Sequence, residues 1–298
     1  MRNFISIIIP LKGRSKFTFR ILSYLSLIKF PYKIYICDGS LSKSNNLKII
    51  NNFKSRLNLK YLKFPYDKNY KYFMKKIYLT LKLIKSNYVM LLPNDDFINV
   101  NFLKSIKKKT NKQIISGILL DFKINNFFRY TNDFGNIKLL KTKEIEYNKK
   151  LNNKKKLERL KYILSFNPYE SIHPKNILLK VIKYSMDFPV NNHKEFMWFF
   201  KFIPLYYARV VYFKKPLLAR QTNTYNGEGN TLYKKNNFSS NYKLLQFQNF
   251  ILKKTKNKEA TQLINNENLK KDLFLIKPNI TIYEKILRTL IDTKLFLS

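Results

Sequence analysis

The stretch that decides the fold is Tyr88-Val89-Met90-Leu91-Leu92-Pro93-Asn94-Asp95-Asp96-Phe97, in which an apolar run stops at two adjacent carboxylates. Residues 88–92 predict a fully buried strand, because the run is too short for a helix and is bounded by Pro and Asn. Such strands belong to parallel sheets that are covered on both faces. Ligands of open α/β sheets bind at the carboxyl ends of the strands, so we expect a ligand near Asp95 and Asp96.

The acid pair itself indicates what kind of ligand this is. Neighbouring carboxylates repel each other unless a cation or hydrogen-bond donors neutralise them. A hard divalent ion such as Mn²⁺ or Mg²⁺, which also binds diphosphates, would do so, and this makes Asp95 and Asp96 candidate metal ligands. The alternative is an Asp-Asp turn that caps the next helix, which is predicted to start near Asn101.

The residues around the acid pair alternate between strand and helix patterns. Strands are predicted at residues 4–11, 32–40, 59–64 and 88–92, and helices at 17–28, 46–53 and 72–84. This order predicts an α/β fold with a parallel sheet and right-handed crossovers. Three strand ends carry Pro10 and Lys12, Asp38 and Ser40, and the acid pair. A nucleotide could lie across these ends, with Asp38 accepting hydrogen bonds from a base or ribose.

Three motifs in this order resemble family 2 type glycosyltransferases with the GT-A fold. The run Ser6-Ile7-Ile8-Ile9-Pro10 resembles the family's first strand, and Ile36-Cys37-Asp38-Gly39-Ser40 resembles its V-D-D-G-S turn. Leu91-Leu92-Pro93-Asn94-Asp95-Asp96-Phe97 resembles its L-D-x-D-D metal site, although Cys37 and Asn94 replace acids of the family pattern. The resemblance covers roughly residues 4–123 and extends more weakly to about residue 220.

The resemblance implies an architecture and a reaction. The architecture is a Rossmann-like, mostly parallel central sheet flanked by helices, followed by a C-terminal helical extension. Residues 1–220 would form the GT-A domain, with a nucleotide-binding half of about 1–123 and an acceptor half of about 124–220. Residues 221–298 would hold a lid loop and the extension. The reaction is inverting transfer of a sugar from a nucleotide-diphosphate sugar to an acceptor hydroxyl in glycan or surface polysaccharide synthesis.

The resemblance also assigns roles on the donor side. Asp38 would contact the nucleotide base, Asp95 the ribose or sugar, and Asp96 the metal. The family places an Arg-Asn pair in the helix before the metal strand, where this chain has Lys75 and Lys76, and Lys75 is the candidate for a phosphate. The candidate donor-binding residues are Pro10, Lys12, Arg14, Asp38, Ser40, Lys75 and Asp95.

The segment Asn191-Asn192-His193-Lys194-Glu195-Phe196-Met197-Trp198-Phe199 resembles the family's E-D-x-x-L-W segment, which supplies the catalytic base. Glu195 is its only acid and is the first candidate for the base, although it lies one residue out of register. His193 is the second candidate, because its ordinary pKa suits base catalysis near neutral pH. The alternative is an aromatic core helix over 196–202 that His193 and Glu195 cap.

The charge of the chain is extreme, with 58 basic residues against 18 acidic ones and a net charge of +40. Nucleic acid and anionic membrane surfaces are the obvious partners of such a chain. However, Lys, Asn, Ile, Phe and Tyr are all abundant, which is typical of AT-rich codons, and Arg, which makes the common base-edge contacts, is rare beside Lys. We therefore expect a nucleotide sugar and a glycan or lipid-linked acceptor as partners, with peripheral contact to an anionic membrane and no specific nucleic acid.

Other features indicate the compartment. No run of eighteen apolar residues predicts a spanning helix, and the first residues do not read as a signal peptide. The single cysteine, Cys37, excludes an internal disulfide, fits a reducing compartment and is expected to be a small buried residue. We expect a cytoplasmic protein, with peripheral binding to the inner face of the membrane left open.

The rest of the chain is predicted more coarsely. Strands are expected at 114–122, 205–212 and 216–220, helices at 154–164, 176–184, 244–252 and 282–297, and a lid loop at 222–230. Three other functions stay open. A nucleotidyltransferase would need a triphosphate-binding loop, of which Lys12-Gly13-Arg14 is a faint version. A basic nucleic-acid-binding protein would not need the acids at strand ends. An inactive transferase homologue would explain Cys37, Asn94 and Lys194.

Overall fold

A computed structural model of the chain describes residues 4–42, 44–106, 113–124, 137–139, 155–160, 168–221 and 241–264. The strands are β1 (Ile5–Leu11), β2 (Lys33–Asp38), β3 (Leu59–Lys63), β4 (Tyr88–Leu91), β5 (Phe97–Ile98), β6 (Gln113–Ile124), β7 (Ile137–Leu139), β8 (Ile172–Pro174) and β9 (Arg209–Gln221). The helices are α1 (Ser15–Leu27), α2 (Asn46–Asn51), α3 (Tyr70–Leu83), α4 (Val100–Ser105), α6 (Lys156–Leu160), α7 (Lys175–Asp187), α8 (His193–Tyr207), α10 (Asn241–Thr255) and α11 (Lys258–Gln262), with a 3₁₀ turn η1 (Pro168–Glu170).

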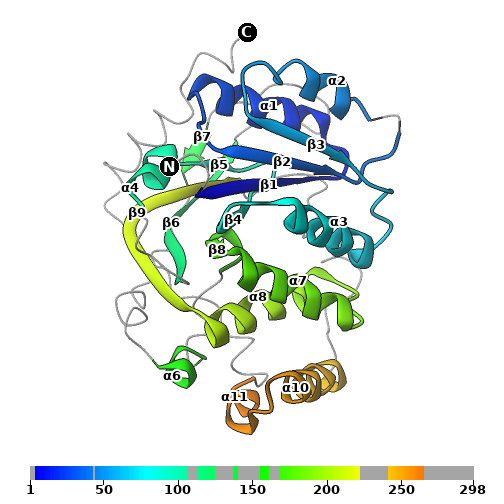
Figure 1. Ribbon diagram of the computed structural model, residues 1–298, viewed down its shortest axis with the longest axis vertical. Helices are drawn as coiled ribbons and strands as arrows, with labels where there is room; N and C mark the ends of the chain where they lie inside the picture. Colours follow the sequence, from blue (N-terminus) through cyan, green and yellow to red (C-terminus); the bar gives the residue numbers. More distant parts are fainter. Residues whose placement is uncertain are drawn as a thin grey trace.

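The strands form one curled sheet in the order β3-β2-β1-β4-β8-β6-β9-β5, with β7 paired to β6 (Figure 1). The first four strands are parallel, as predicted. Beyond β4 the sheet is mixed: β8 runs antiparallel to β4 and β6, β9 runs parallel to β6, and β5 is antiparallel to β9. The carboxyl ends of β1, β2, β3 and β4 therefore meet at one edge of the sheet, and the α/β prediction is confirmed.

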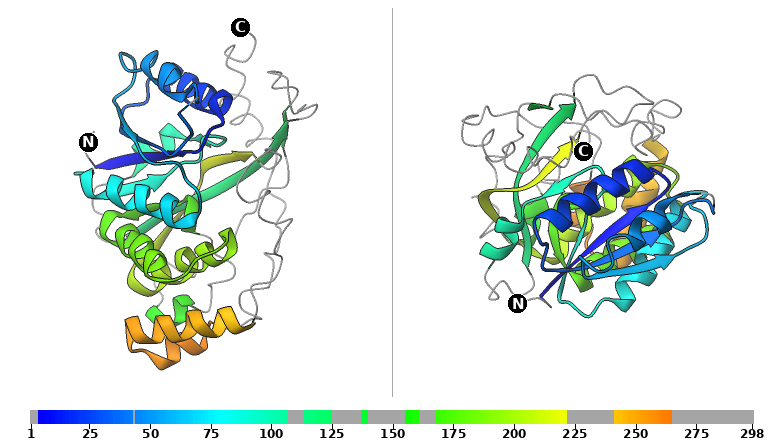
Figure 2. Two further views of the ribbon diagram at one scale, coloured as in Figure 1. Left: turned by 90° about the vertical axis from the view of Figure 1, so that its right-hand side faces the viewer. Right: turned by 90° about the horizontal axis from the view of Figure 1, so that it is seen from above.

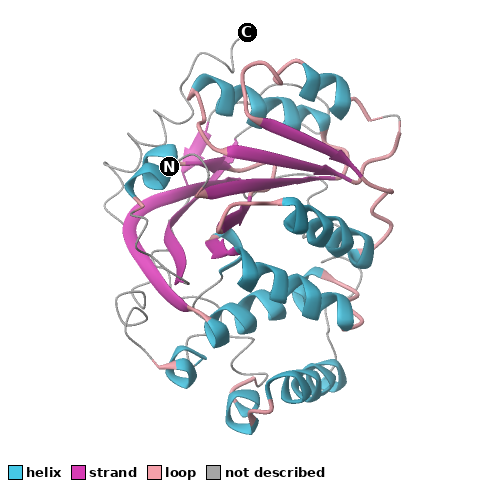
Figure 3. Ribbon diagram, in the orientation of Figure 1, coloured by secondary structure: helices cyan, strands magenta, loops and turns pink. Residues whose placement is uncertain are grey.

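Helices cover both faces of the parallel part (Figure 3). Alternate residues of β1 point to opposite faces, as the pleat of a strand requires. Ile7 and Ile9 pack with the core beneath α1 and α2, whereas Ile8 packs with the core that includes α3, α7 and α8. Beyond α8, α10 forms a further layer at the far end of the molecule, where the Phe247 ring contacts Phe199 with centroids 4.9 Å apart (Figure 2).

The buried interior matches the composition. Cys37 lies in β2 and is fully buried, which confirms the prediction of a small core residue. Its burial raises the pKa of the thiol to about 12. In the part of the chain that the structure describes, no helix is long and apolar enough to span a membrane.

One predicted boundary is wrong. The strand expected at 205–212 begins only at Arg209, because residues 205–207 form the last turn of α8. Leu205 is fully buried on a helix that is apolar on almost every side, and in such a run the periodicity does not separate helix from strand. The strands expected at 205–212 and 216–220 form one strand, β9, and the short strands β5, β7 and β8 were not predicted. The lid loop at 222–230 and the helix at 282–297 lie outside the described residues.

Candidate functional site

The turn after β1 is tied to the turn after β2. Gly13 has φ +69° and Arg14 has φ 58° and ψ 46°, so two successive residues are left-handed. The Gly13 N–H donates to the Ser40 hydroxyl, and the Asn46 amide donates to that hydroxyl at 3.0 Å and to the Gly13 carbonyl at 3.2 Å. This geometry directs Arg14 to the end of β4, where its guanidinium lies 2.8 Å from Asp95 Oδ2.

Asp38 is fixed at the end of β2 by donors on both carboxylate oxygens. Oδ1 accepts from the Ser40 N–H at 2.8 Å, and Oδ2 accepts from the Tyr61 hydroxyl at 2.9 Å. The Lys63 ammonium lies 3.6 Å from Oδ2 and donates to the Ser40 carbonyl at 2.6 Å. The Asp-Gly-Ser turn is therefore held rigidly before any ligand binds.

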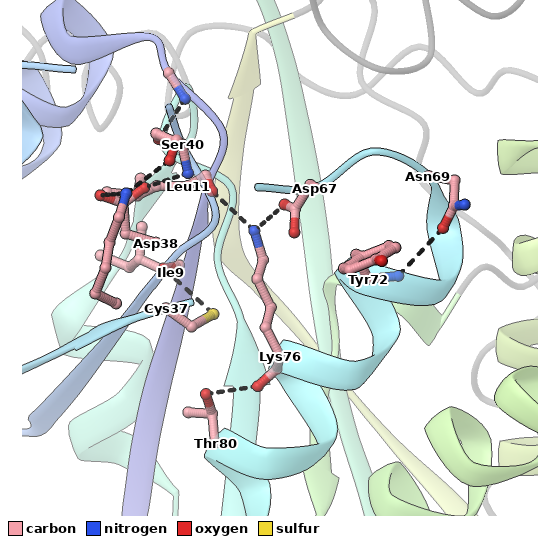
Figure 4. Close-up of polar contacts among 12 residues, drawn as sticks. Ile9, Leu11, Cys37, Asp38, Ser40, Asp67, Asn69, Tyr72, Lys76 and Thr80 are labelled. Atoms are coloured by element: carbon pink, nitrogen blue, oxygen red, sulfur yellow. Dashed lines mark hydrogen bonds and ion pairs between the residues drawn. The ribbon is translucent and has the colours of Figure 1, made fainter. Parts of the chain in front are cut away.

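A buried ion pair that the sequence did not reveal supports the same edge. Lys76 reaches from α3 to the carbonyl of Leu11 at 2.8 Å and to the carboxylate of Asp67, and both charged side chains are about 1% exposed (Figure 4). A Cβ on Gly39 would lie 2.4 Å from Asp67 Oδ1, so only glycine fits there. Lys75, the predicted phosphate ligand, is exposed. Its neighbour Lys76 is the residue that reaches the strand ends.

The acid pair after β4 is buried, with Asp95 8% and Asp96 3% exposed. Arg20 donates to the Asp95 carbonyl at 2.8 Å and to the Gln221 side-chain oxygen at 2.7 Å. The backbone N–H of Gln221 donates to Asp96 Oδ1 at 3.1 Å. Burial raises the pKa of Asp96 well above its ordinary value, and the charge of Asp95 raises it further. Burial lowers the pKa of Arg20 to about 10, although Asp95 and Asp96 oppose this shift.

A second group of acids lies beside the first and is organised by Arg220. Its guanidinium donates to both Asp121 oxygens, at 2.8 and 3.0 Å, and to Glu170 Oε1 at 3.1 Å. Glu170 belongs to η1, just before β8, and the register of β8 with β4 pairs Ile172 with Met90. Glu170 is therefore carried toward the carboxyl end of β4. Burial raises the pKa of Glu170, and Arg220 opposes this shift.

The start of α8 is closed by a reciprocal cap. The Asn192 side chain accepts from the Glu195 N–H at 3.0 Å. In return, Glu195 Oε2 accepts from the Asn191 N–H at 2.9 Å, and Oε1 accepts from the Asn192 amide at 3.1 Å. This is a capping-box arrangement. His193 is the first residue of the helix, and its ring centroid lies 6.4 Å from that of Tyr169. The geometry follows the capping alternative, and the assignment of Glu195 or His193 as base stays a prediction.

The structure brings together only some of the predicted donor-site residues. Those that meet at the sheet edge are Arg14, Asp38, Ser40, Asp95 and Asp96. Pro10 is half-buried within β1, opposite Cys37, and Lys12 is exposed with its ammonium 5.5 Å from the centroid of the Tyr66 ring. Sequence reasoning missed Arg20, Asp67, Asp121, Glu170, Arg220 and Gln221, and of the adjacent Lys75 and Lys76 it chose Lys75 as the candidate. Asp67 carried a usable signal, because it is an acid shortly after a predicted strand, and so did Asp121 and Arg220, which lie at the ends of the strands predicted at 114–122 and 216–220.

The acid pair fits a divalent cation only with help from a ligand. Among the described residues, no group of three or more His, Cys, Asp or Glu side chains is placed to hold a metal ion. Mg²⁺ is commonly bound by one or two carboxylates together with substrate phosphates. Asp96 is buried next to the like charge of Asp95, and both effects raise its pKa. A bound cation would stabilise the charged carboxylate and so oppose these effects. The donor set therefore fits a metal that arrives with a diphosphate.

Comparisons with known proteins identify the fold. No protein-family model matches the chain, and no curated protein sequence matches it. Among solved structures, S. aureus TarS 1–349 is similar with a TM-score of 0.57 and 16% identity, over 89% of this chain and 70% of that chain. The complex of TarS 1–349 with UDP-GlcNAc is similar with a TM-score of 0.58 and 14% identity, over 89% of this chain and 71% of that chain. Its complex with UDP is similar with a TM-score of 0.56 and 17% identity, over 89% of this chain and 70% of that chain. At such identities the similarity establishes the fold, and it agrees with the GT-A-like architecture expected from the motifs.

Proposed function

We propose that this protein is a glycosyltransferase that moves a sugar from a nucleotide-diphosphate sugar to an acceptor hydroxyl, with inversion. The observation that carries the proposal is the meeting of Arg14, Asp38, Ser40, Asp95 and Asp96 at the carboxyl ends of β1, β2 and β4. Ligands of α/β sheets bind at such an edge. The fold is shared with TarS, which has been solved with UDP-GlcNAc and with UDP. This likeness supports a nucleotide-sugar ligand.

On the donor side, the nucleoside would lie over the ends of β1 and β2, near Pro10, Asp38 and Ser40. Asp95 would contact the ribose or the sugar, and Arg14, already bound to Asp95, would hold that carboxylate in place. Arg14 and Lys12 would also contribute positive charge toward the diphosphate. Lys75 is exposed and would act through its charge alone.

A Mn²⁺ or Mg²⁺ ion would be held by Asp96, with Asp95 nearby, and would offset the charge that develops on the leaving diphosphate. The chain prepares this position from two sides. The Gln221 N–H orients Asp96, and Arg20 binds both the Gln221 side chain and the Asp95 carbonyl. The last residue of β9 is thereby locked to the turn that follows β4.

The proposal extends to the surroundings of the reaction. The acceptor would be a glycan or a lipid-linked chain, and the protein would act in the cytoplasm, with the Lys excess favouring contact with an anionic membrane. Residues 1–220 would carry donor and acceptor sites, and 221–298 would add the lid loop and the helical extension.

The test is binding of nucleotide diphosphates and their sugars, measured by thermal shift and calorimetry with and without Mn²⁺. We expect UDP or UDP-GlcNAc to raise the Tm of the wild type more strongly with Mn²⁺ than without it. Asp96→Ala should lose the metal-dependent part of the affinity and keep its fold. Asp187→Asn, which removes an exposed carboxylate paired with Lys254, is the matched control.

Three results would contradict the proposal in different ways. If no nucleotide diphosphate or nucleotide sugar binds, the transferase function is wrong. If the triphosphate binds far better than the diphosphate and its sugar, a nucleotidyltransferase is favoured. If Asp96→Ala keeps the metal-dependent affinity, the metal site is wrong.

A further inference from the structure

Glu170 has one carboxylate oxygen that nothing in the described part of the chain uses. The residue is 6% exposed, and its Oε1 accepts from Arg220 at 3.1 Å. Its Oε2 is buried and has no hydrogen-bond partner among the described residues. A buried acceptor without a donor costs about 1–3 kcal/mol. Such a group in a well-packed protein calls for an explanation, and a donor that arrives with a ligand is one.

The carboxylate lies at the proposed donor site. Arg220, which binds its Oε1, is followed in β9 by Gln221, whose N–H holds Asp96. The charge of Glu170 also contributes to the raised pKa of Asp96. Glu170 and the acid pair therefore face the same edge of the sheet, and the Glu170 carboxylate is close enough for its charge to act on Asp96.

The turn that carries Glu170 is rigid. The Ser171 N–H donates to the Pro168 carbonyl at 2.9 Å, and His173 Nε2 lies 2.6 Å from the same oxygen. Burial lowers the pKa of His173 to about 4, so the ring is neutral near pH 7 and binds this carbonyl as an Nε2–H donor. On the other side, the Tyr169 ring packs against Phe200 of α8 with centroids 4.9 Å apart. A carboxylate on a turn that is held in this way keeps its position while a substrate reacts.

We propose that Glu170 is the catalytic base of this protein, a role that the resemblance assigned to Glu195. The inference rests on the proposed function. The acceptor oxygen forms a bond to the anomeric carbon while the bond from that carbon to the diphosphate oxygen breaks. The electron pair of the broken bond leaves with the diphosphate, and the hydroxyl proton passes to Glu170 Oε2.

The surrounding charges suit this role. Arg220 is bound by two Asp121 oxygens as well as by Glu170, so it keeps an anionic partner when Glu170 takes a proton. Burial and the charge of Asp121 make the Glu170 carboxylate more basic, and Arg220 keeps it from becoming neutral too readily. A base works best when its pKa lies near the working pH. Glu195 differs, because both of its oxygens already accept hydrogen bonds in the cap of α8.

The experiment compares Glu170→Gln and Glu195→Gln, with Asp187→Asn as the remote control. UDP-GlcNAc with Mn²⁺ is the probe, its affinity is measured by calorimetry, and turnover is followed as UDP released with water as acceptor. Glu170→Gln should lose about 10²–10⁴-fold in turnover, the usual contribution of a positioned base, at unchanged donor affinity. The remote control Asp187→Asn should turn over like the wild type, and Glu195→Gln tests the rival assignment of the base.

The outcomes separate the two proposals. A wild type that binds no nucleotide sugar contradicts the proposed function. If the wild type binds and hydrolyses UDP-GlcNAc and Glu170→Gln is equally active, only the role of Glu170 is contradicted. If Glu195→Gln alone loses turnover, the role of the base returns to Glu195. If Glu170→Gln does not fold, Glu170→Asp decides. It keeps the carboxylate but withdraws it by about 1 Å, which should cost up to about 10²-fold. Full turnover in that variant would overturn the proposal.

Discussion

Glu170 and Glu195 are the same residue type, and both are buried, at 6% and 2% exposed, yet their surroundings differ. Both oxygens of Glu195 accept hydrogen bonds at the start of α8, one from the backbone N–H of Asn191 and one from the side-chain amide of Asn192. Glu170 binds an arginine through one oxygen, and its other oxygen is buried without a hydrogen-bond partner among the described residues. The difference teaches that the register of a motif locates an acid along the chain, whereas its hydrogen bonds show which part of the structure it already supports.

The two regions also differ in what their charges do for stability. At the sheet edge, Arg14, Arg20 and Arg220 lie among Asp95, Asp96, Asp121 and Glu170. Burying that many ions costs desolvation energy that their pairing only partly returns. The cap of α8 uses a single acid to satisfy helix-end donors, which stabilises the helix. We therefore expect variants at the edge to show large effects on stability that depend on pH, and variants at the cap to show small ones.

The largest effect on stability is expected for Arg220→Met. Removal of the guanidinium leaves Asp121 and Glu170 buried without their cation, which should cost about 3–5 kcal/mol of unfolding free energy near neutral pH. The measurement is chemical denaturation of wild type and variant. The loss should shrink as the pH falls, because burial raises the pKa of Glu170 and a protonated Glu170 no longer needs a counterion.

Arg220→Lys is the matched control for this change, because it keeps the charge and loses the fork that binds Asp121 with two bonds. It should lie between the wild type and Arg220→Met. If Arg220→Met is as stable as the wild type, the acids at the sheet edge are not held by this cation, and the contrast with the cap fails.

A smaller effect is expected from His173, which fixes the turn that carries Glu170. The folded pKa of about 4 lies below the ordinary 6.5, so the folded protein binds this proton less readily than the unfolded chain. Its contribution to stability is therefore complete above about pH 6.5 and is lost as the pH falls toward 4, by about 3 kcal/mol in total.

His173→Phe keeps a ring in this fully buried position and removes the titration. The stability of the variant, measured by denaturation between pH 4 and about 7, should fall less steeply with acid than that of the wild type. Glu170 and Asp96 have raised pKa values and act in the opposite direction, but they are present in both proteins and cancel in the difference. Equal slopes would show that His173 does not titrate in this window.

The parts of the site that the sequence predicted are those encoded locally. A strand can be recognised from a short apolar run, and in a parallel sheet the polar residues at its end are automatically brought to the common edge, as happened for Asp38, Ser40 and the acid pair. Lys75 and Lys76 were adjacent candidates, and only the packing of α3 shows which one is buried.

The parts that were missed depend on contacts between distant segments. Gln221 holds Asp96 across 125 positions of sequence, and Arg220 binds Asp121 across 99. Glu170 is brought toward the end of β4 because the short strand β8 returns antiparallel to β4. No periodicity in the chain encodes that return, since three residues are too few to carry a pattern. The candidate base of the resemblance was therefore the one that a local motif could offer.

The smallest effect is expected for Glu195→Gln, and it bears most directly on the comparison. The amide keeps the shape of the side chain and one accepting oxygen, but it loses the charge that favours the start of α8 and one of the two accepted hydrogen bonds. The cost should be about 1 kcal/mol of unfolding free energy, as for other helix caps. Asn192→Ala, which removes the other half of the cap, should cost about as much, because the two side chains satisfy each other.

If Glu195 serves only the cap, both variants should keep wild-type turnover at temperatures where they are folded. A Glu195→Gln variant that is as stable as Asn192→Ala but has lost turnover would show that Glu195 does chemistry as well, and the distinction between the two acids would collapse.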